Sequence, residues 1–480
     1  MRPFSRAAVR LQPWLPAVLA VTLVACASAP YQRPGAPVPQ AFKEAPAPAS
    51  DWFPAAPADA LDRGPWWQLF NDPDLDALAE QVEISNQNVA AASAAYAEAQ
   101  ALVREQRATL FPMLGLDASA GKSGAGRGAA KASSAQLGFT ASWEPDLWGK
   151  LALGIAGAQA SAEASAANLA AARLSAQAAL ATDYFALRED DHQIALLVSA
   201  VGAYQRSLTI TVNQYNAGIA QRTDVLEAQT LLATTQANLV TLKGQLAVLE
   251  HAIALLVGRA PGGFVIPVAE RNVTVPAVPL GMPSELLQRR PDIAVAERTV
   301  AAANAQIGID RSAYFPSLDL SASFGGAAAN LADVLSASNS LWSIGLSVAQ
   351  TVFDAGAITA RVEGAEAARD VAIANYRQTV LAAFQSVEDQ LATIRSLSGQ
   401  VDLRRAASAD ADRTEELTLN QYLEGQVPYT TVVAVQVIAL NARQTLSQLT
   451  ASRQAAAIAL IQALGGGWHA GSISDSESSK

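Results

Sequence analysis

Cysteine and histidine are scarce in this chain of 480 residues, and their scarcity removes several classes of function. The one cysteine, Cys26, cannot form an internal disulfide. The three histidines have no ligands around them at the spacing of a zinc site, and no residue stands in a nucleophile–base pattern: His192, His251 and His469. We therefore expect neither an enzyme nor a protein with a bound cofactor or metal.

Basic residues are outnumbered. The chain has 33 Lys and Arg against 43 Asp and Glu. Arg2, Arg6 and Arg10 are the only charges in the first 25 residues, so without that segment 30 basic residues face 43 acidic ones, a net charge of −13. The phosphates of nucleic acids select basic proteins, so we expect no nucleic-acid partner.

Long apolar runs are missing as well. After Cys26 no stretch of 18 or more apolar residues occurs, whereas a membrane-spanning helix needs about 20. Only helices and closed barrels satisfy their backbone hydrogen bonds within lipid. Any membrane crossing by this chain is therefore expected to use strands.

The first 25 residues have the layout of an export signal. An apolar run at 15–25 follows the three arginines and is short for a membrane span, so we predict a signal peptide over 1–25. The run ends in Leu23-Val24-Ala25-Cys26, which is similar to the lipobox of bacterial lipoproteins. That similarity implies a diacylglycerol on the Cys26 thiol and an N-acyl chain such as palmitate. An ordinary cleavage site beside a chance cysteine is the alternative.

Two features describe the expected mature N-terminus. Ala27 occupies the position at which Asp is associated with retention in the inner membrane, so the lipoprotein resemblance implies the outer membrane. Pro and Ala then dominate to about residue 59, a composition that favours an extended chain. We predict a lipid anchor and a Pro/Ala-rich tether over 26–60.

The chain contains an internal repeat with a spacing of about 205 residues. Phe111-Pro112-Met113-Leu114-Gly115-Leu116 recurs as Phe315-Pro316-Ser317-Leu318-Asp319-Leu320, and Gln214-Tyr215-Asn216-Ala217-Gly218 recurs as Gln421-Tyr422-Leu423-Glu424-Gly425. This period is too long for a solenoid, so we predict a duplicated half-protein. The expected layout has two repeats with a linker and two flanking equatorial segments: repeats 84–258 and 289–465, linker 259–288, flanks 61–83 and 466–480.

Both repeats show the same order of expected elements. A helix is stopped by Pro112 or Pro316, because proline cannot continue a helix interior. A β-hairpin, a very long helix, a turn at Gly218 or Gly425 and a return helix of roughly 35 residues follow. The expected ranges are helices 84–110 and 291–314, hairpins 113–146 and 317–353, and long helices 150–216 and 356–423. At 1.5 Å per residue the long helices measure about 100 Å.

The expected strands alternate strictly between apolar and polar residues. In the first, Leu114, Leu116, Ala118 and Ala120 alternate with Gly115, Asp117, Ser119 and Gly121. This pattern fits a transmembrane barrel, and a soluble sandwich with the apolar face as its core is the alternative. Four strands cannot close a barrel; two copies supply eight strands, and three supply twelve and leave a lumen. We predict a mixed fold, in which a β-barrel with four strands per subunit continues into an α-helical coiled-coil barrel.

The motifs resemble those of the outer membrane factor (TolC/OprM-like) family of tripartite efflux systems, in its NodT-type lipoprotein subgroup. The matching segments are Leu23-Val24-Ala25-Cys26, Trp66-Trp67-Gln68-Leu69-Phe70-Asn71-Asp72-Pro73, Trp143-Glu144-Pro145-Asp146-Leu147-Trp148-Gly149-Lys150, Arg289-Arg290-Pro291-Asp292-Ile293 and Ala463-Leu464-Gly465-Gly466-Gly467-Trp468. The resemblance implies a homotrimer, a twelve-stranded barrel and a periplasmic tunnel. It also implies a periplasmic adaptor, a proton-driven inner-membrane transporter and passive export of small molecules such as drugs.

The family resemblance also assigns roles to the helix turns. It implies that an adaptor meets a surface made by Tyr215, Gly218, Tyr422, Gly425 and Val427. Acidic residues after the second turn commonly ring the closed tunnel in this family, but this sequence has Thr431 and Ala434 there. Asp224 and Glu227 follow the first turn and share one helix face, so we predict acidic rings from them, with a plain solvated helix face as the alternative.

Two other classes of protein stay open at this point. One is a structural lipoprotein whose helices form a rod without a lumen, which would not conduct ions. The other is a diffusion porin, which would conduct without an adaptor. The exported compound cannot be deduced from the sequence.

Overall fold

The computed structural model describes residues 31–44, 65–124, 132–269, 273–276, 278 and 289–466. The signal peptide, Cys26 and Trp468 lie outside the described residues. The chain divides into two compact units, and each draws on both halves of the sequence. Unit 1 contains Tyr96–Ala164 and Ala296–Tyr376, and unit 2 contains Ala36–Ala95, Ser165–Val295 and Arg377–Lys480.

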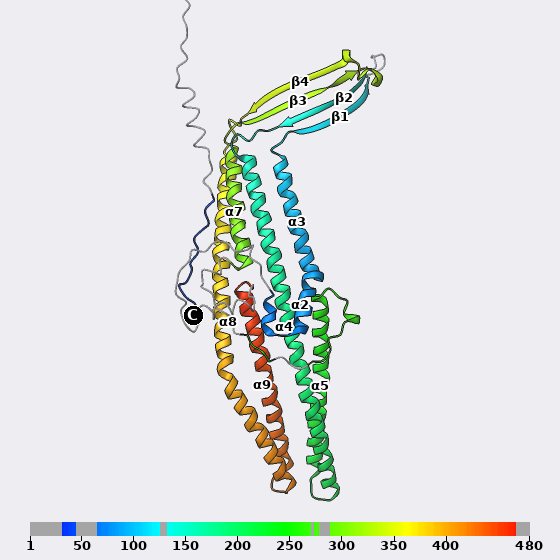
Figure 1. The fold of residues 1–480 in the computed structure, drawn as a ribbon, viewed down its shortest axis with the longest axis vertical. Helices are drawn as coiled ribbons and strands as arrows, with labels where there is room; N and C mark the ends of the chain where they lie inside the picture. Colours follow the sequence, from blue (N-terminus) through cyan, green and yellow to red (C-terminus); the bar gives the residue numbers. More distant parts are fainter. Residues whose placement is uncertain are drawn as a thin grey trace, which may run out of the picture. The chain divides into compact units, whose positions relative to one another are not determined.

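Unit 1 is built on a four-stranded antiparallel sheet with the order β1-β2-β3-β4 (Figure 1). The strands are β1 (Met113–Ser123), β2 (Ala132–Trp143), β3 (Ser317–Ala328) and β4 (Ser340–Ala349). Two hairpins from distant parts of the chain meet where β2 pairs with β3, and Phe139 lies opposite Phe324 there. The sheet therefore contains one hairpin from each half of the sequence.

Aromatic side chains fix the junctions between strands and helices in unit 1. The indole of Trp143 donates to the carbonyl of Leu110 at 2.9 Å, and that of Trp148 donates to the carbonyl of Pro316 at 2.6 Å. The Trp148 ring also stacks on Phe315, with ring centroids 4.9 Å apart. Each indole thus satisfies a carbonyl in the short connection between a helix and the strand that follows it.

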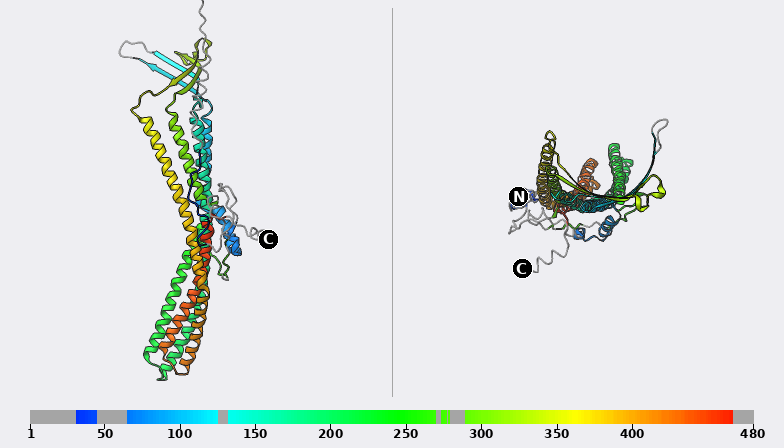
Figure 2. Two further views of the ribbon diagram at one scale, coloured as in Figure 1. Left: turned by 90° about the vertical axis from the view of Figure 1, so that its left-hand side faces the viewer. Right: turned by 90° about the horizontal axis from the view of Figure 1, so that it is seen from above.

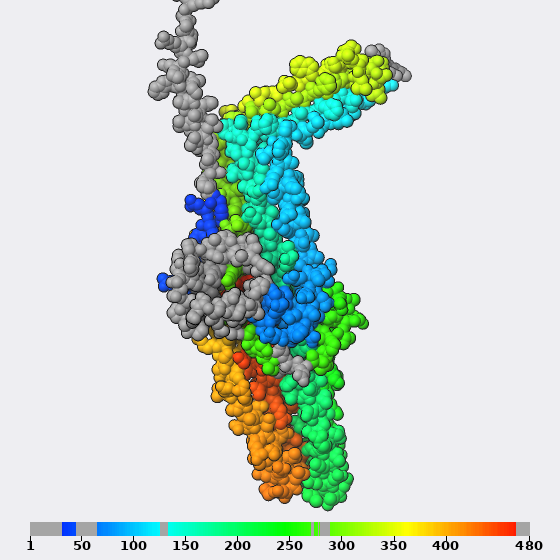
Figure 3. All heavy atoms as spheres, in the orientation of Figure 1, coloured from blue at the N-terminus to red at the C-terminus, as the bar shows by residue number. Residues whose placement is uncertain are grey.

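In unit 2 two long helical hairpins run side by side and turn at the same end (Figures 1 and 2), and the first helix of each begins within unit 1. The first joins α4 (Lys150–Asn216) to α5 (Arg222–Leu256), and the second joins α8 (Ala357–Leu423) to α9 (Tyr429–Ala463). Both turns protrude at the lower end of the space-filling view, where the first is green and the second orange (Figure 3).

Corresponding helices in the two halves have equal lengths. Both α4 and α8 have 67 residues, and both α5 and α9 have 35. The helices that precede the sheet, α3 (Gln87–Ala108) and α7 (Pro291–Ser312), have 22 residues each. The predicted long helix 150–216 is confirmed over the same residues.

The expected helix over 84–110 is wrong at its start. Ile84 belongs to a separate helix, α2 (Pro73–Ser85), and α3 begins only at Gln87. Asn86 separates them, because its side-chain oxygen accepts from the backbone of Asn88 and Val89 at 2.9 and 3.1 Å. Asparagine at such a position ends α2, because its side chain caps the start of α3.

The largest apolar core of unit 2 surrounds α2. The short helix η1 (Trp66–Phe70) buries Trp66 and Phe70 against α4, and the Trp66 indole donates to Gln177 at 3.1 Å. Asp72 then caps α2 by accepting from the backbone of Leu75 at 3.2 Å. In the segment 66–73, Trp66 and Phe70 therefore anchor the core, and Asp72 caps the helix that follows.

Among the described helices, α5 is long and apolar enough, by length and composition, to cross a membrane. Its apolar side chains have another use, because Leu231 and Leu232 pack with Tyr204 of α4 and Leu440 of α9. Packing within unit 2 thus accounts for some of the apolar side chains of α5, whereas Val240 and Val248 are 71% and 65% exposed in this chain.

Candidate functional site

The sheet of unit 1 has two chemically different faces. Its register aligns one apolar row across all four strands, formed by Leu116, Phe139, Phe324 and Trp342. The neighbouring row on the other face is small and polar, formed by Gly115, Thr140, Ser323 and Ser343. The alternation predicted for single strands therefore extends over the whole sheet.

The apolar row is open in this chain. Leu116, Phe324 and Trp342 are 62%, 63% and 75% exposed, so no second sheet of the described chain covers them. A soluble sandwich would bury this face as its core. The edges of β1 and β4 also lack partners within the described sheet, so their backbone groups need strands from other copies to be satisfied in lipid.

The two helix turns of unit 2 have the same backbone geometry. Gly218 and Gly425 have positive φ angles of 77° and 74°, which glycine adopts without strain. The amide of Ile219 donates to the carbonyl of Gln214, and that of Gln426 donates to the carbonyl of Gln421, both at 2.8 Å. These bonds close each helix with the six-residue ring of a Schellman motif.

A row of polar side chains on α4 joins the first hairpin to the second close to these turns. Spacings of three, four and three residues place the row on one helix face, and we call it the polar ladder: Tyr204, Ser207, Thr211 and Gln214. Its partners on the second hairpin are Tyr422, Tyr429 and Gln436.

Two tyrosines of the second hairpin make the outermost contacts of the polar ladder. The Tyr422 hydroxyl donates to Gln214 Oε1 at 2.5 Å and lies 3.4 Å from Thr211 Oγ1. The Tyr429 hydroxyl shares a hydrogen bond of 3.1 Å with Ser207. Burial raises the pKa of both phenols, so they remain neutral and able to donate.

The last contact of the ladder lies further along α4. There the Tyr204 hydroxyl donates to the backbone carbonyl of Gln436 at 3.3 Å. The four contacts therefore hold α4 against α8 and α9 with side chains from a single face.

The structure separates two tyrosines that the repeat makes equivalent. Tyr215 is 40% exposed, with the Arg222 guanidinium 5.8 Å from its ring centroid. Tyr422 is only 7% exposed, because it packs against Tyr429 and bonds to α4. The Tyr422 side chain, which was expected on the adaptor surface, is thus packed between the hairpins in this chain, and its hydroxyl bonds to α4. Gly218 and Gly425 are exposed and Val427 is half-buried.

The residues expected to form a gate fall into two groups. Asp224 accepts from the backbone amide of Gln221 at 3.0 Å, so its carboxylate caps α5. Glu227 is half-buried, and its Oε2 atom is shielded from solvent without a hydrogen-bond partner. Thr431 and Ala434 lie exposed on α9. The two acids thus lie beside the polar ladder, and both add to the raised pKa of Tyr429.

The described part of the predicted tether, residues 31–44, has no helix or strand. In unit 1 the Tyr31 hydroxyl donates to Glu297 at 2.5 Å. In unit 2 the backbone amides of Lys43 and Glu44 donate to the Glu388 carboxylate at 2.7 and 3.0 Å. Side chains of the helices therefore hold this segment, and its role as a tether stays a prediction.

Arg188 forms a buried ionic site that was not predicted from the sequence. Its side chain is 2% exposed, and its guanidinium contacts Asp74 at 3.2 Å, Asp191 at 3.3 Å and the carbonyl of Pro267 at 2.7 Å. It also lies 4.9 Å from the Tyr184 ring centroid. Burial, aided by neighbouring acids, raises the pKa of Asp190 to about 6. The run Arg188-Glu189-Asp190-Asp191 in an Ala-rich helix is the signal that was available.

The described residues contain no group of three or more His, Cys, Asp or Glu side chains placed to hold a metal ion.

Known proteins are similar to this chain in both sequence and fold. The model of the outer membrane efflux protein family matches residues 78–259 and 282–466. This chain therefore belongs to the outer membrane efflux proteins, and it is the outer-membrane channel component of an efflux system. Such channels have a β-barrel with a helical barrel, and they work with a periplasmic adaptor and an inner-membrane transporter.

Individual relatives cover nearly the whole chain. The cation efflux system protein CusC of Escherichia coli O6:H1 is 29% identical, over 95% of this chain and 98% of its own length. The pyoverdine export outer membrane protein OpmQ of Pseudomonas aeruginosa is 31% identical, over 86% and 90%. The solved structure of the outer-membrane channel OprN matches with a TM-score of 0.81 at 28% identity, over 92% of this chain and 99% of that one.

Proposed function

We propose that three copies of this chain form one closed duct, with twelve strands in the outer membrane and a helical tunnel in the periplasm. The observation that carries this proposal is the sheet of unit 1, with an exposed apolar face, a small polar face and two open edges. A ring of identical subunits closes such edges, and twelve strands leave a lumen lined by the polar face. A rod without a lumen does not need this sheet.

Each subunit is proposed to be a duplicated half, with repeats over 84–258 and 289–465. Equal helix lengths and the matching turns at Gly218 and Gly425 support duplication. The segments 61–83, 259–288 and 466–480 are assigned to an equatorial belt. The trimer would then contain six similar units around its axis.

We propose that Cys26 carries the lipid anchor after removal of residues 1–25. The hydrogen bonds of Tyr31, Lys43 and Glu44 to the helices support a tether that starts near that residue. Two acyl signals are needed for stable membrane attachment, which a diacylglycerol and an N-acyl chain provide.

The adaptor surface is proposed to comprise the exposed parts of the two turns, around Tyr215, Gly218, Gly425 and Val427. We assign Tyr422 and Tyr429 a different role: with the polar ladder they hold the second hairpin against the first. Loss of these bonds would free the second hairpin to move, and would widen the tunnel at this end. Asp224 and Glu227 remain gate candidates because they lie beside these bonds, and Thr431 and Ala434 because they are exposed on α9.

The experiment replaces both tyrosines by phenylalanine. Tyr422→Phe with Tyr429→Phe removes two hydroxyl groups and retains the rings, at a cost of about 1–3 kcal/mol in total. Because the closed arrangement loses its bonds, single-channel conductance in planar bilayers is expected to rise, by roughly fivefold or more in open time. Tyr215→Phe is the matched control, since its ring is partly exposed and belongs to the equivalent turn. An unchanged open time in the double variant would rule out the polar ladder as the contact that keeps the channel closed.

The substrate is proposed to be chosen by the inner-membrane transporter rather than by this chain. Relatives of similar identity are named for cations, toluene and pyoverdine, so a shared fold serves chemically unrelated cargo. A wide duct makes few selective contacts with a small molecule.

A further inference from the structure

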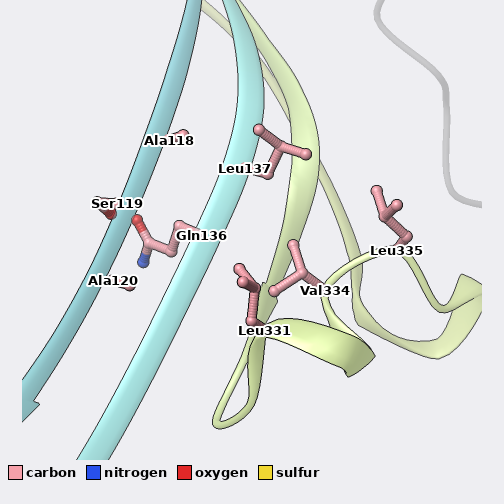
Figure 4. A pocket seen from close by; sticks show the side chains of 8 residues that line it. All are labelled: Ala118, Ser119, Ala120, Gln136, Leu137, Leu331, Val334 and Leu335. Carbon is pink, nitrogen blue, oxygen red and sulfur yellow. The ribbon is translucent and has the colours of Figure 1, made fainter.

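The loop between β3 and β4 folds back over the apolar face of the sheet in unit 1 (Figure 4). It contains two short turns, η3 (Leu331–Asp333) and η4 (Ala337–Asn339). Gly326 permits the approach, because a Cβ atom there would overlap the carbonyl oxygen of Val334. Gly326 pairs with Leu137, which belongs to the apolar face, so the loop lies on that side of the sheet.

Three apolar side chains of this loop have opposite environments. Val334 is 2% exposed and anchors the loop on the sheet, whereas Leu331 and Leu335 are 73% and 82% exposed. Exposed leucines on both sides of a buried anchor are unfavourable in water, because the free energy falls when apolar surface leaves water. They are favourable where the surroundings are lipid.

A cleft lies between this loop and the sheet. It has a volume of about 550 Å³, and its walls are aliphatic and aromatic: Leu116, Leu137, Phe139, Phe324, Val334 and Leu335. Ser336 and Ser340 also line it, but their hydroxyl groups donate within the loop, to the carbonyls of Asp333 and Ala337 at 2.8 and 2.9 Å. The cleft is therefore apolar.

We propose that this cleft binds one acyl chain of a lipid in the outer leaflet of the outer membrane. The inference rests on the proposed barrel, in which the apolar face of the sheet contacts lipid. The cleft is continuous with that face, since Phe324 belongs both to the cleft and to the exposed apolar row. The β3–β4 loop lies at the end of the strands away from the helices (Figure 1), which is the outer-leaflet end of a barrel whose helices are periplasmic.

The occupant follows from the chemistry of the walls. An acyl chain between Leu335 and the sheet contacts the protein on two sides, whereas a chain on the open face contacts it on one, so packing holds the chain in the cleft more firmly. One site per subunit predicts three bound lipids per trimer.

The test measures lipid bound to the intact trimer. Delipidated protein in detergent is titrated with a saturated phosphatidylethanolamine, and native mass spectrometry counts the lipids. The wild-type trimer is expected to bind three lipid molecules tightly. Leu335→Ser, which removes one wall of the cleft, should weaken this binding roughly tenfold. Ala337→Phe, which fills the cleft, should abolish it.

The matched control removes apolar groups from the same face outside the cleft. Ile344→Ser with Val348→Ser alters side chains that are 78% and 63% exposed, and should leave the three tight sites unchanged. Equal losses in Leu335→Ser and in the control pair would overturn the proposal, as would undiminished binding by Leu335→Ser. Conductance is recorded from the same preparations: a trimer that conducts but binds no lipid overturns the cleft alone, whereas protein that neither trimerises nor conducts overturns the proposed duct.

Discussion

Ile344→Arg is expected to prevent stable insertion of the barrel into membranes. Ile344 lies on the apolar face of β4 and is 78% exposed in the single chain, so in the proposed barrel it contacts lipid. An arginine on the lipid-facing side near the midplane costs about 2–4 kcal/mol. Three symmetric copies multiply this cost, which is enough to shift most of the protein out of the membrane fraction.

The neighbouring residue supplies the control for this substitution. Ser343 lies at the same depth of β4 and on the polar face, where it shares a hydrogen bond of 2.8 Å with Ser323. Ser343→Arg should insert normally and shift the ion selectivity of the channel toward anions, because its charge would line the lumen. Membrane fractionation followed by planar-bilayer recording separates the two results. Normal insertion of Ile344→Arg would contradict the assignment of the two faces.

Arg188→Met is expected to destabilise the helical unit by about 3–5 kcal/mol. The substitution leaves the Asp191 carboxylate, which is 8% exposed, without its cationic partner, and it orphans the carbonyl of Pro267. Breaking a buried ion pair costs far more than breaking an exposed one, because the remaining charge stays out of water. Unfolding of the purified protein in denaturant, followed by circular dichroism, measures the loss.

Arg413→Met tests whether burial is the cause. Arg413 and Glu416 form an ion pair with the same spacing of three residues on a helix, but their side chains are 63% and 62% exposed. Exposed pairs contribute about 0–1 kcal/mol, so this variant should unfold almost like the wild type. Similar losses in both variants would show that the ionic site around Arg188 has no special role.

The elements of the fold were largely predictable because their signals are local. The helix over 150–216 follows the Trp143–Lys150 motif and ends at a glycine turn, and the structure has it over the same residues. Strict alternation in residues 114–121 likewise predicted the strand β1. The break at Asn86 was missed, because the sequence does not show whether an asparagine lies within one long helix or caps the start of a second one.

The candidate site was less predictable because it depends on residues far apart in the chain. Tyr422 bonds to Gln214, 208 residues away, and no local pattern reveals that pairing. Tyr215 and Tyr422 are equivalent in the repeat, yet only the second is buried between the hairpins. The sequence predicted acidic rings from Asp224 and Glu227, and the structure adds a contact that was not predicted, because the Asp224 carboxylate caps its own helix.

The most direct test of a continuous duct is the ion conductance of the purified wild-type protein in planar bilayers. A trimer that inserts with its barrel is expected to give discrete single-channel steps, with longer open times when Tyr422 and Tyr429 lose their hydroxyl groups. Protein that inserts into the bilayer as a trimer and never conducts, in either form, would contradict a continuous duct.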